Sequence, residues 1–256
     1  MTGLSETELE RYSRQLVLPE WSGAAQERLK ASSVIVVGAG ALGSPVATYL
    51  AAAGVGQIGV VDEDVVELSN LHRQPLHFTP DLGLPKASNA VVKLGALNPE
   101  IQVDQYPVRL DQENAEAIVM GADLAVDCSD TFETRYVVND ACCAQGVQLV
   151  EAGVLGFGGL VMSIRPGESA CYRCAFPTEP ENVPSCREAG VLGAMAGVVG
   201  SIQALEALKL LAGVGEPLID AILQIDGIDM GFTRVSTERR SDCPACARVP
   251  AASQSG

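Results

Sequence analysis

The chain is 256 residues long, 47% hydrophobic and only 4% aromatic, and it carries a net charge of −15. So acidic a chain lacks the basic face that nucleic acids and anionic membrane surfaces require, which argues against both kinds of partner. The composition suits one large α/β domain with an aliphatic core, so any phosphate site must be built locally from a few cations.

The N-terminus and the cysteines indicate the compartment. Residues 1–14 are polar and charged, unlike a secretory signal. The longest uncharged stretch, Ala189–Leu205, is glycine-rich and short for a bilayer span, so we expect a buried helix there. Eight cysteines without a signal favour a reducing compartment. We therefore expect a cytoplasmic protein whose cysteines are thiols or metal ligands.

Hydrophobic periodicity predicts alternating helices and strands after a helical N-terminal segment, residues 1–30. The first strand, Ser33–Val37, leads into a helix over Gly40–Ala53, and a second strand, Gln57–Val61, completes a βαβ unit. An irregular stretch, Val65–Pro85, follows. Further helices are expected at 86–97, 131–145 and 189–211, and strands at 101–106, 124–127, 147–151, 155–164, 218–228 and 232–235. We expect one domain over 31–249 and a disordered tail over 250–256.

The most informative motif is a β-branched strand that runs into G-x-G-x-x-G, formed by Gly38, Gly40 and Gly43. Such a turn brings the backbone close to a nucleotide and aims a helix N-terminus at phosphate. An acidic run, Asp62–Asp64, follows about 20 residues later, where a carboxylate can hold ribose hydroxyls. The motif alone does not distinguish a dinucleotide from ATP.

The residues after the second strand favour a nucleoside triphosphate. Arg73 can fork onto phosphate oxygens, and Lys86 supplies a point charge at an expected helix N-terminus, where a cation is unfavourable unless an anion is bound. Asp130 follows a strand end, where a carboxylate can hold Mg²⁺ with phosphate oxygens. An NAD(P)-dependent Rossmann oxidoreductase is the alternative, but it leaves these cations unexplained; a non-catalytic adapter is a third hypothesis.

Two C-x-x-C pairs, Cys171/Cys174 and Cys243/Cys246, lie far apart in the sequence. Each pair directs two sulfurs toward one point, so that together they complete a tetrahedral S₄ zinc site. The alternative is a set of redox dithiols or free thiols. Three further cysteines lie in apolar runs and are expected to pack in the core: Cys128, Cys142 and Cys143.

Taken together, these motifs resemble the adenylating enzymes of the ubiquitin-activating type in their bacterial MoeB/ThiF form. The resemblance covers nearly the whole chain. Its elements are Arg11–Gln15, the glycine turn, Asp62 with Ser69–Gln74, Pro85-Lys86, Asp127–Asp130, the two C-x-x-C pairs, Cys186–Val191 and Gln203–Lys209.

The resemblance implies acyl-adenylation. The C-terminal Gly-Gly carboxylate of a ubiquitin-like sulfur-carrier protein, MoaD- or ThiS-like, attacks the α-phosphate of Mg-ATP and yields an acyl-adenylate and pyrophosphate. The product serves thiocarboxylate formation in molybdopterin or thiamine biosynthesis or a related thiolation pathway. The implied fold is Rossmann-like and doubly wound, with a mainly parallel sheet, C-terminal antiparallel strands and a structural Zn²⁺ bound by four cysteines. Implied partners are a second copy of the chain and a separate sulfurtransferase or cysteine desulfurase.

By the same resemblance, Arg73 and Lys86 clamp phosphates, Asp130 positions Mg²⁺, and Arg14 reaches the ATP of the partner subunit. Cys186 matches a cysteine that forms a covalent link with the carrier in ThiF-type members but is not needed in MoeB-type members, so both readings stay open. The residues implied to contact the nucleotide are Gly38, Gly40, Ala41, Gly43, Asp62, Asp64, Ser69, Asn70, Arg73, Gln74, Lys86, Asp130 and Thr131.

Two positions depart from the family pattern without removing a charge. Ala41 stands where glycine is frequent, and its methyl group narrows the approach of the backbone to the nucleotide. Thr131 stands where asparagine is frequent, and threonine can still cap the helix that follows. We expect His72 to be structural, because a carboxylate nucleophile needs no general base. We expect the same of His77, because it has no metal-ligand spacing.

Overall fold

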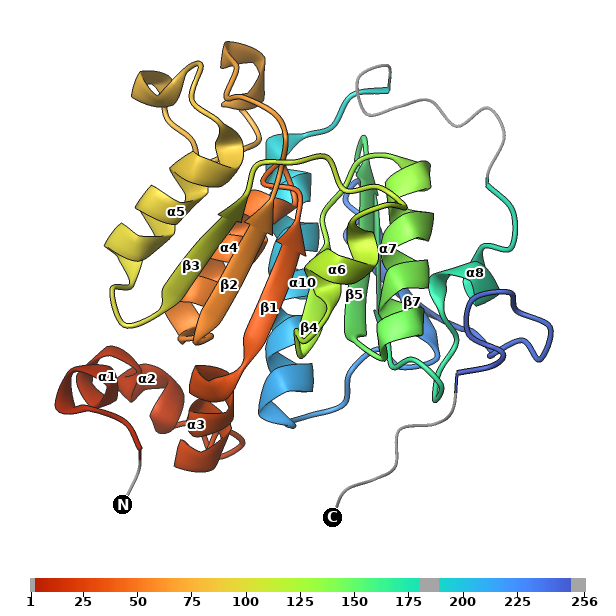
Figure 1. The fold of residues 1–256 in the computed structure, drawn as a ribbon, viewed down its shortest axis with the longest axis horizontal. Coiled ribbons are helices and arrows are strands. Elements are labelled where there is room, and N and C mark those ends of the chain that lie inside the picture. Colours follow the sequence, from red (N-terminus) through yellow and green to blue (C-terminus); the bar gives the residue numbers. More distant parts are fainter. Residues whose placement is uncertain (1–2, 180–188, 250–256) are drawn as a thin grey trace.

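Parallel strands at the centre of one sheet organise the chain. The computed structural model describes residues 3–179 and 189–249 and contains an eight-stranded sheet in the order β3-β2-β1-β4-β5-β6-β7-β8 (Figure 1). The strands β3, β2, β1, β4 and β5 run parallel to one another. Strands β6, β7 and β8 follow, and each pairs antiparallel with the strand before it. The strands are β1 (Ser33–Val37), β2 (Gln57–Val61), β3 (Gln102–Tyr106), β4 (Leu124–Asp127), β5 (Gln148–Leu155), β6 (Gly158–Ile164), β7 (Ala221–Asp226) and β8 (Gly231–Ser236).

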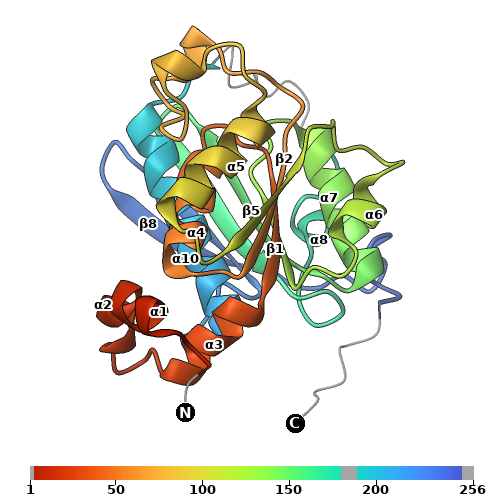
Figure 2. The ribbon, with the colours of Figure 1, turned by 60° about the vertical axis from the view of Figure 1, so that its left-hand side comes forward.

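Helices cover both faces of this sheet, as the two views show (Figures 1 and 2). Helices α3, α4, α5 and α10 lie on one face, and α6, α7 and α8 lie on the other. The helices are α1 (Glu6–Arg11), α2 (Ser13–Leu16), α3 (Gly23–Ala31), α4 (Gly43–Ala53), α5 (Lys86–Leu97), α6 (Ala115–Val119), α7 (Phe132–Gln145), α8 (Tyr172–Ala175) and α10 (Gly193–Ala212), with single 3₁₀ turns η1 (Leu68–Asn70) and η2 (Thr79–Asp81).

Strand β1 shows how the sequence fills both cores. Val34 and Val36 pack in the core beneath α4 and α10, whereas Ile35 and Val37 pack in the core beneath α7. A strand buried on both faces has no polar alternation, which explains its unbroken apolar run. The predicted doubly wound, mainly parallel fold with C-terminal antiparallel strands is therefore confirmed.

Helix α10 joins the two parts of the sheet. By length and composition it could cross a membrane, but 56% of its apolar window is buried, and it packs on α3, α4, β5 and β6. Its fully buried Gln203 donates from Nε2 to the carbonyl oxygens of Asp127 (2.6 Å) and Val150 (3.2 Å). This amide fixes the helix against β4 and β5, and the expected buried helix is confirmed.

Several predicted boundaries shift for local reasons. Helix α4 begins at Gly43 rather than at Gly40, because the intervening residues form the glycine turn. The expected strand 155–164 is divided by a turn, with Leu155 ending β5 and Gly158 beginning β6. The helical N-terminal segment is three short helices, α10 begins later than expected, and α6 and α8 are too short for periodicity to reveal.

Two expectations fall on residues outside the described ranges. They are the role of Cys186 and the disordered tail of residues 250–256.

The contact between the start of α4 and the glycine turn leads to a stability prediction. A Cβ on Gly43 would lie 1.8 Å from the carbonyl oxygen of Gly38, whereas a Cβ on Gly197 in α10 meets nothing within 4 Å. We expect Gly43→Ala to lower the free energy of unfolding by about 1–3 kcal/mol, because backbone must move. Gly197→Ala should raise it by about 0.5–1 kcal/mol through helix propensity. Urea unfolding of both variants measures this, and equal stability of the two would contradict it.

Candidate functional site

A cleft of about 550 Å³ opens at the carboxyl ends of β1, β2 and β4. This is the edge at which open parallel α/β sheets bind ligands. The described residues that line it include most of the sequence-predicted set: Gly38, Gly40, Ala41, Asp62, Asp64, Asn70, Arg73, Gln74, Lys86, Asp130 and Thr131.

The glycine turn forms the floor of this cleft. Gly38 has a φ of +95°, and a Cβ there would lie 2.9 Å from the carbonyl oxygen of Cys128, so only glycine fits. Its N–H donates to the carbonyl oxygen of Val61 at 2.7 Å. The Asp62 carboxylate accepts from the N–H of Ala39 at 2.7 Å, which ties the end of β2 to the turn.

The Asp62 carboxyl is partly shielded from water. Burial raises its pKa, while the nearby Lys86 ammonium and the N–H groups of Ala39 and Asp64 oppose the rise. A carboxylate so placed has its oxygens directed by backbone donors, and it lies where a ribose would meet the end of β2.

Lys86 enters the cleft from the first residue of α5, the helix start that the sequence predicted. Its Nζ lies 2.8 Å from Asp64 Oδ2, and the Lys86 side chain is 6% exposed whereas that of Asp64 is 62% exposed. The ion pair therefore holds a buried cation at a helix N-terminus, where the helix itself favours an anion. A bound phosphate would pair with the Lys86 ammonium and would also be favoured by the N-terminus of α5.

The loop after β2 presents further polar groups to the cleft. Asn70 is buried and caps its own turn, because its Oδ1 accepts from the N–H of Glu67 at 3.0 Å. Arg73 Nη1 donates to the carbonyl oxygen of Ser69 at 2.7 Å and contacts His72. Gln74 is buried, and its Oε1 has no hydrogen-bond partner within 3–179 and 189–249, so it is available to a ligand.

Thr131 and Asp130 close the far side of the cleft. Thr131 is the N-cap of α7, and its Oγ1 accepts from the N–H of Thr134 at 3.2 Å, so the departure from asparagine keeps the cap. Asp130 is exposed at the end of the loop after β4, in a position open to a cation.

Arg109 also lines the cleft, and its Nη2 lies 3.2 Å from Glu133 Oε2. The sequence did not indicate this residue, because a lone arginine in a loop belongs to no motif.

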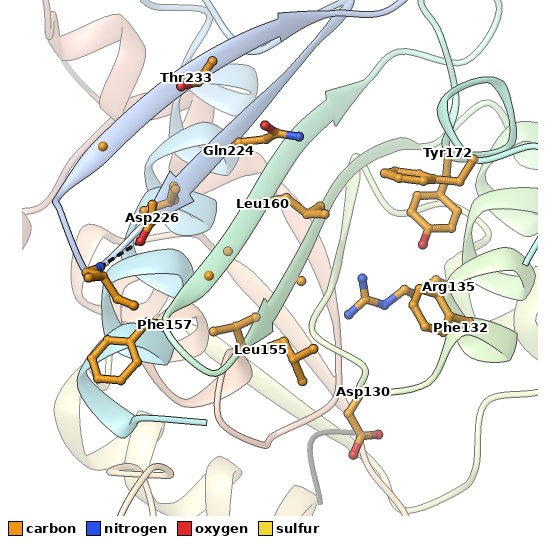
Figure 3. Close-up of a pocket in the computed structure, with 18 of the residues that line it drawn as sticks. Asp130, Phe132, Arg135, Leu155, Phe157, Leu160, Tyr172, Gln224, Asp226 and Thr233 are labelled. Carbon is orange, nitrogen blue, oxygen red and sulfur yellow. Dashed lines mark hydrogen bonds between the residues drawn. The ribbon is translucent and has the colours of Figure 1, made fainter. Parts of the chain in front are cut away.

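A second cavity of about 1100 Å³, which we call the apolar groove, lies beside the cleft (Figure 3). Strands β5 to β8 and helices α7 and α8 supply its walls. It shares four residues with the cleft, so the two cavities adjoin: Asp130, Thr131, Arg135 and Val154. The sequence did not indicate this groove, because its lining comes from segments that only the sheet brings together.

A buried charged group lies under the shared wall. Asp127 and Glu151 are Cα partners on β4 and β5, both carboxyls are fully buried, and Arg135 Nη1 lies 3.4 Å from Glu151 Oε1. Burial, and then the carboxylate of Asp127, raise the pKa of Glu151 well above its usual value, although Arg135 opposes the rise. Asp127 is therefore buried beneath the wall, whereas Asp130 of the same motif is exposed in the cleft. The sequence did not indicate Arg135 or Glu151.

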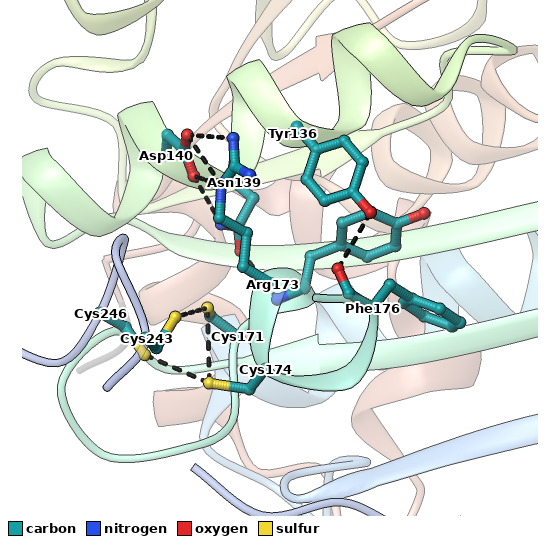
Figure 4. A network of polar contacts seen from close by, with 10 residues as sticks. Tyr136, Asn139, Asp140, Cys171, Arg173, Cys174, Phe176, Cys243 and Cys246 are labelled. Atoms are coloured by element: carbon teal, nitrogen blue, oxygen red, sulfur yellow. Dashed lines mark hydrogen bonds and ion pairs between the residues drawn. The ribbon is translucent and has the colours of Figure 1, made fainter. Parts of the chain in front are cut away.

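Four cysteines cluster at a different place in the fold (Figure 4). Cys171, Cys174, Cys243 and Cys246 are buried, and their sulfurs all lie within 4.8 Å of one another. The pairs 171–174, 171–243 and 174–246 are 3.8, 3.5 and 3.4 Å apart. Sulfurs bound tetrahedrally at about 2.3 Å from Zn²⁺ lie about 3.8 Å apart, so the cluster fits a metal ion. Cys128, Cys142 and Cys143 are buried in the core, as expected.

Arg14 lies away from the cleft of its own chain. It is exposed on α2, in an arm that packs at the amino end of the sheet. Two hydrogen bonds hold the arm there, one buried and one partly buried. Asn98 Nδ2 donates to the Tyr12 hydroxyl at 2.9 Å, and Gln15 Nε2 donates to the carbonyl oxygen of Ala53 at 3.2 Å. Arg14 therefore cannot join the other predicted site residues of the same protomer.

The strand order and the polar cleft at the strand ends define a Rossmann-like nucleotide-binding protein. The ThiF family matches residues 12–245. The chain belongs to this family, and the resemblance stated from the motifs is confirmed.

Relatives with similar sequences have named activities. The chain is 49% identical over 253 residues to the sulfur carrier protein adenylyltransferase of Thermus thermophilus, covering 96% of this chain and 93% of that protein. It is 46% identical over 245 residues to the SAMP-activating enzyme E1 of Haloferax volcanii, covering 95% and 90%. Among solved structures, E. coli MccB with ATP superposes with a TM-score of 0.83 at 25% identity, covering 92% of this chain and 74% of MccB.

The environment of His77 predicts how the stability of the protein depends on pH. This imidazole is buried, its Nε2 lies 3.0 Å from the carbonyl oxygen of Ala39 in the glycine turn, and Asn89 contacts its Nδ1 at 3.0 Å. Burial lowers the pKa of His77, although the contact with Ala39 opposes this. The unfolded histidine takes up a proton below about pH 6.5. The unfolded state then binds more protons, so stability falls as the pH drops below 6.5 toward the pKa of the folded state.

We expect the wild-type protein to lose up to about 1.4 kcal/mol per pH unit from this residue in that window. Thermal unfolding at pH 7.5 and 5.5 measures the loss, and His77→Gln should show a smaller drop in Tm. His72→Gln removes an exposed imidazole and should behave like wild type. Parallel pH profiles for wild type and His77→Gln would contradict the prediction.

Proposed function

We propose that this protein is an adenylyltransferase that uses ATP to activate the C-terminal Gly-Gly carboxylate of a ubiquitin-like sulfur-carrier protein. The observation that carries the proposal is the junction of two cavities of opposite character. The cleft has cations and a glycine turn suited to a triphosphate, and the apolar groove is open enough for an extended peptide tail. The named activity of the Thermus thermophilus relative supports the same reading.

Different residues of the cleft bind different parts of ATP. Asp62 holds the ribose, the glycine turn carries the phosphates on backbone N–H groups, and Arg73 and Lys86 neutralise phosphate oxygens. A Mg²⁺ held by Asp130 and phosphate oxygens would supply further positive charge to the leaving pyrophosphate. When ATP binds, a phosphate replaces the Asp64 carboxylate as the partner of the Lys86 ammonium. The buried cation is therefore paired with an anion both before and after binding.

The reaction is a displacement at the α-phosphorus. A carboxylate oxygen of the tail forms a bond to this phosphorus, and the bond to the bridging oxygen of the β-phosphate breaks. Pyrophosphate leaves with the electron pair, and no proton has to be removed, because the nucleophile is already an anion. The protein therefore contributes positioning and charge rather than acid–base chemistry.

The partners follow from the same proposal. Arg14 lies on the exposed arm, so we infer that it serves the ATP of a second copy in a homodimer. Sulfur would come from a separate sulfurtransferase or cysteine desulfurase in the cytoplasm, for molybdopterin, thiamine or a related pathway. Cys186, which lies outside the described residues, is kept as a candidate for a covalent link with the carrier.

We also infer that the four-cysteine cluster holds Zn²⁺ for a structural purpose. Its sulfur spacings fit a tetrahedral site, and all four ligand positions are protein sulfurs, so no position is left for substrate. The N–H of Arg240 donates to Cys174 Sγ at 3.3 Å, a contact that stabilises a thiolate. Bound metal would join α8 to the C-terminal residues.

The proposed activity is tested by the exchange of radioactive pyrophosphate into ATP. Wild type with Mg²⁺ and a ubiquitin-like carrier from its own genome should catalyse exchange, and the same carrier lacking its last glycine should not. We expect Lys86→Met to lower kcat/KM for ATP by about 100-fold or more, because a buried cation no longer meets the phosphates.

The matched control is Lys93→Met. Lys93 lies on the same helix, pairs with Asp81 at 3.1 Å and does not line the cleft. It should keep exchange near the wild-type rate. The proposal is wrong if no Gly-Gly-ended carrier of the host supports exchange, or if wild type instead reduces NAD(P)⁺ with a small-molecule substrate.

Metal removal gives a separate prediction. Stripping the protein with a strong chelator should lower Tm by several degrees, since each 1 kcal/mol lost lowers Tm by about 2–4 °C in a protein of this size. Affinity for ATP should change little, because the four cysteines of the cluster do not line the cleft. Cys243→Ser should abolish zinc binding measured by atomic absorption, and Cys142→Ser, a core cysteine, should keep it. Freshly purified wild type without zinc would refute the metal assignment.

A further inference from the structure

The guanidinium of Arg135 lies where the two cavities meet. Among the described residues, Arg135 is the one cationic side chain that lines the apolar groove, and it also lines the nucleotide cleft. Figure 3 shows the guanidinium pointing into the groove, between Tyr172 and Asp130. A peptide tail that follows the groove toward the α-phosphate must therefore pass this cation.

The donors of Arg135 are poorly satisfied by the protein. The residue is only 9% exposed, yet its contacts with Glu151 Oε1 and with the carbonyl oxygen of Ser129 are long, at 3.4 and 3.5 Å. The Tyr172 side chain is a third partner, through a hydrogen bond to the guanidinium. A guanidinium has five N–H donors, and buried donors are nearly always paired at short distance. The group therefore retains donors for a ligand.

The pairing of Arg135 with its nearest acid is also incomplete. Arg135 Nη1 stands 3.4 Å from Glu151 Oε1, and neither carboxyl oxygen of Glu151 has a hydrogen-bond partner within residues 3–179 and 189–249. Burial raises the pKa of this carboxyl well above its usual value. The Oδ1 atom of Asp127 is directed to the N–H of Ser129 at 2.8 Å. A buried cation with an incomplete partner attracts an anion that enters the groove.

We propose that Arg135 binds the terminal carboxylate of the carrier protein and holds it beside Asp130 for attack on ATP. The inference deepens the proposed function and rests on it. A planar guanidinium can accept a carboxylate through two parallel hydrogen bonds, which orients the nucleophile. The pairing also offsets the repulsion between an anionic tail and a triphosphate. It makes a free carboxylate, rather than the Gly-Gly sequence alone, the feature that the junction recognises.

Gly153 provides an independent way to test this position. A Cβ on Gly153 would lie 2.6 Å from Arg135 Nη1 and 3.1 Å from Nη2, so the guanidinium lies directly over the bare Cα of β5. Gly153→Ala moves the guanidinium without removing its charge, and the clash falls on the end of a flexible side chain. Arg135→Gln removes the charge but leaves Asp127 and Glu151 buried without it, which can destabilise the fold.

The experiment measures binding of the carrier in two forms, one with its natural C-terminal carboxylate and one with a C-terminal amide. Titration calorimetry in the presence of a non-hydrolysable ATP analogue gives both dissociation constants. We expect wild type to prefer the carboxylate by about 10- to 100-fold, the range for one charge-assisted pair. Arg135→Gln and Gly153→Ala should reduce this preference to less than about threefold. Arg28→Gln, whose guanidinium contacts the Ala212 carbonyl oxygen away from both cavities, should keep it.

Two outcomes overturn the role of Arg135. The first is a wild-type protein that binds acid and amide equally, and the second is a Gly153→Ala protein, folded by circular dichroism, that keeps the full preference. Pyrophosphate exchange by wild type is followed in parallel. If wild type exchanges pyrophosphate and both variants keep the full preference for the carboxylate, only the role of Arg135 is rejected. If wild type neither exchanges pyrophosphate nor binds any carrier, the proposed function is rejected as well.

Discussion

The close approach of two backbone segments at Gly38 and Gly43 is the constraint on which the rest of the site depends. The start of α4 packs directly on the carbonyl of Gly38, and Gly38 packs on the carbonyl of Cys128 at the end of β4. This contact sets the floor of the cleft and brings the loop that carries Asp130 next to the glycine turn. Asp62 and His77 then hold the same turn from two other sides, through Ala39. A single residue too large at this point would separate elements that must act together.

An acidic protein that binds a polyanion must concentrate its few cations. The chain has 17 Lys and Arg against 32 Asp and Glu, yet four cationic side chains among the described residues line one cleft. Lys86 and Arg135 are buried and work in a medium of low polarity, where a charge interacts more strongly with a ligand. The surrounding negative charge repels anions elsewhere on the surface, which restricts phosphate binding to this edge of the sheet.

How much the sequence could predict depends on whether a site is local in the chain. The strand β1, the glycine turn and helix α5 are each encoded by contiguous residues, and their bounds or motifs were predicted closely. The cysteine cluster was also predictable, because C-x-x-C spacing has a fixed geometric meaning even when the two pairs are far apart. Most of the nucleotide-site residues were grouped correctly around one cleft, although their roles in binding remain predictions. The Arg14 arm is the exception: it lies at the other end of the sheet.

The apolar groove and its charged wall could not be predicted in the same way. Arg135 reads as one more polar residue in a helix, and Glu151 as the end of an apolar strand. Their significance arises only when β4 and β5 pair in register, which buries Glu151 beside Asp127 and leaves room above Gly153. Long-range pairing of this kind leaves no periodic trace in a single sequence. The short helices α6 and α8 escaped for a different reason, since four or five residues are too few to show a helical period.

Helix α8 lies between the apolar groove and the four-cysteine cluster and contributes residues to both. Tyr172 and Phe176 form part of the wall of the apolar groove, and their rings pack with centroids 4.9 Å apart. Tyr172 is also the residue next to Cys171, and Cys174 lies on the same short helix. A helix of four residues has little stability of its own, so the four sulfurs fix where this aromatic wall stands. If the cluster holds Zn²⁺, as we propose, loss of the metal would displace the aromatic wall of the apolar groove and leave the nucleotide cleft unchanged.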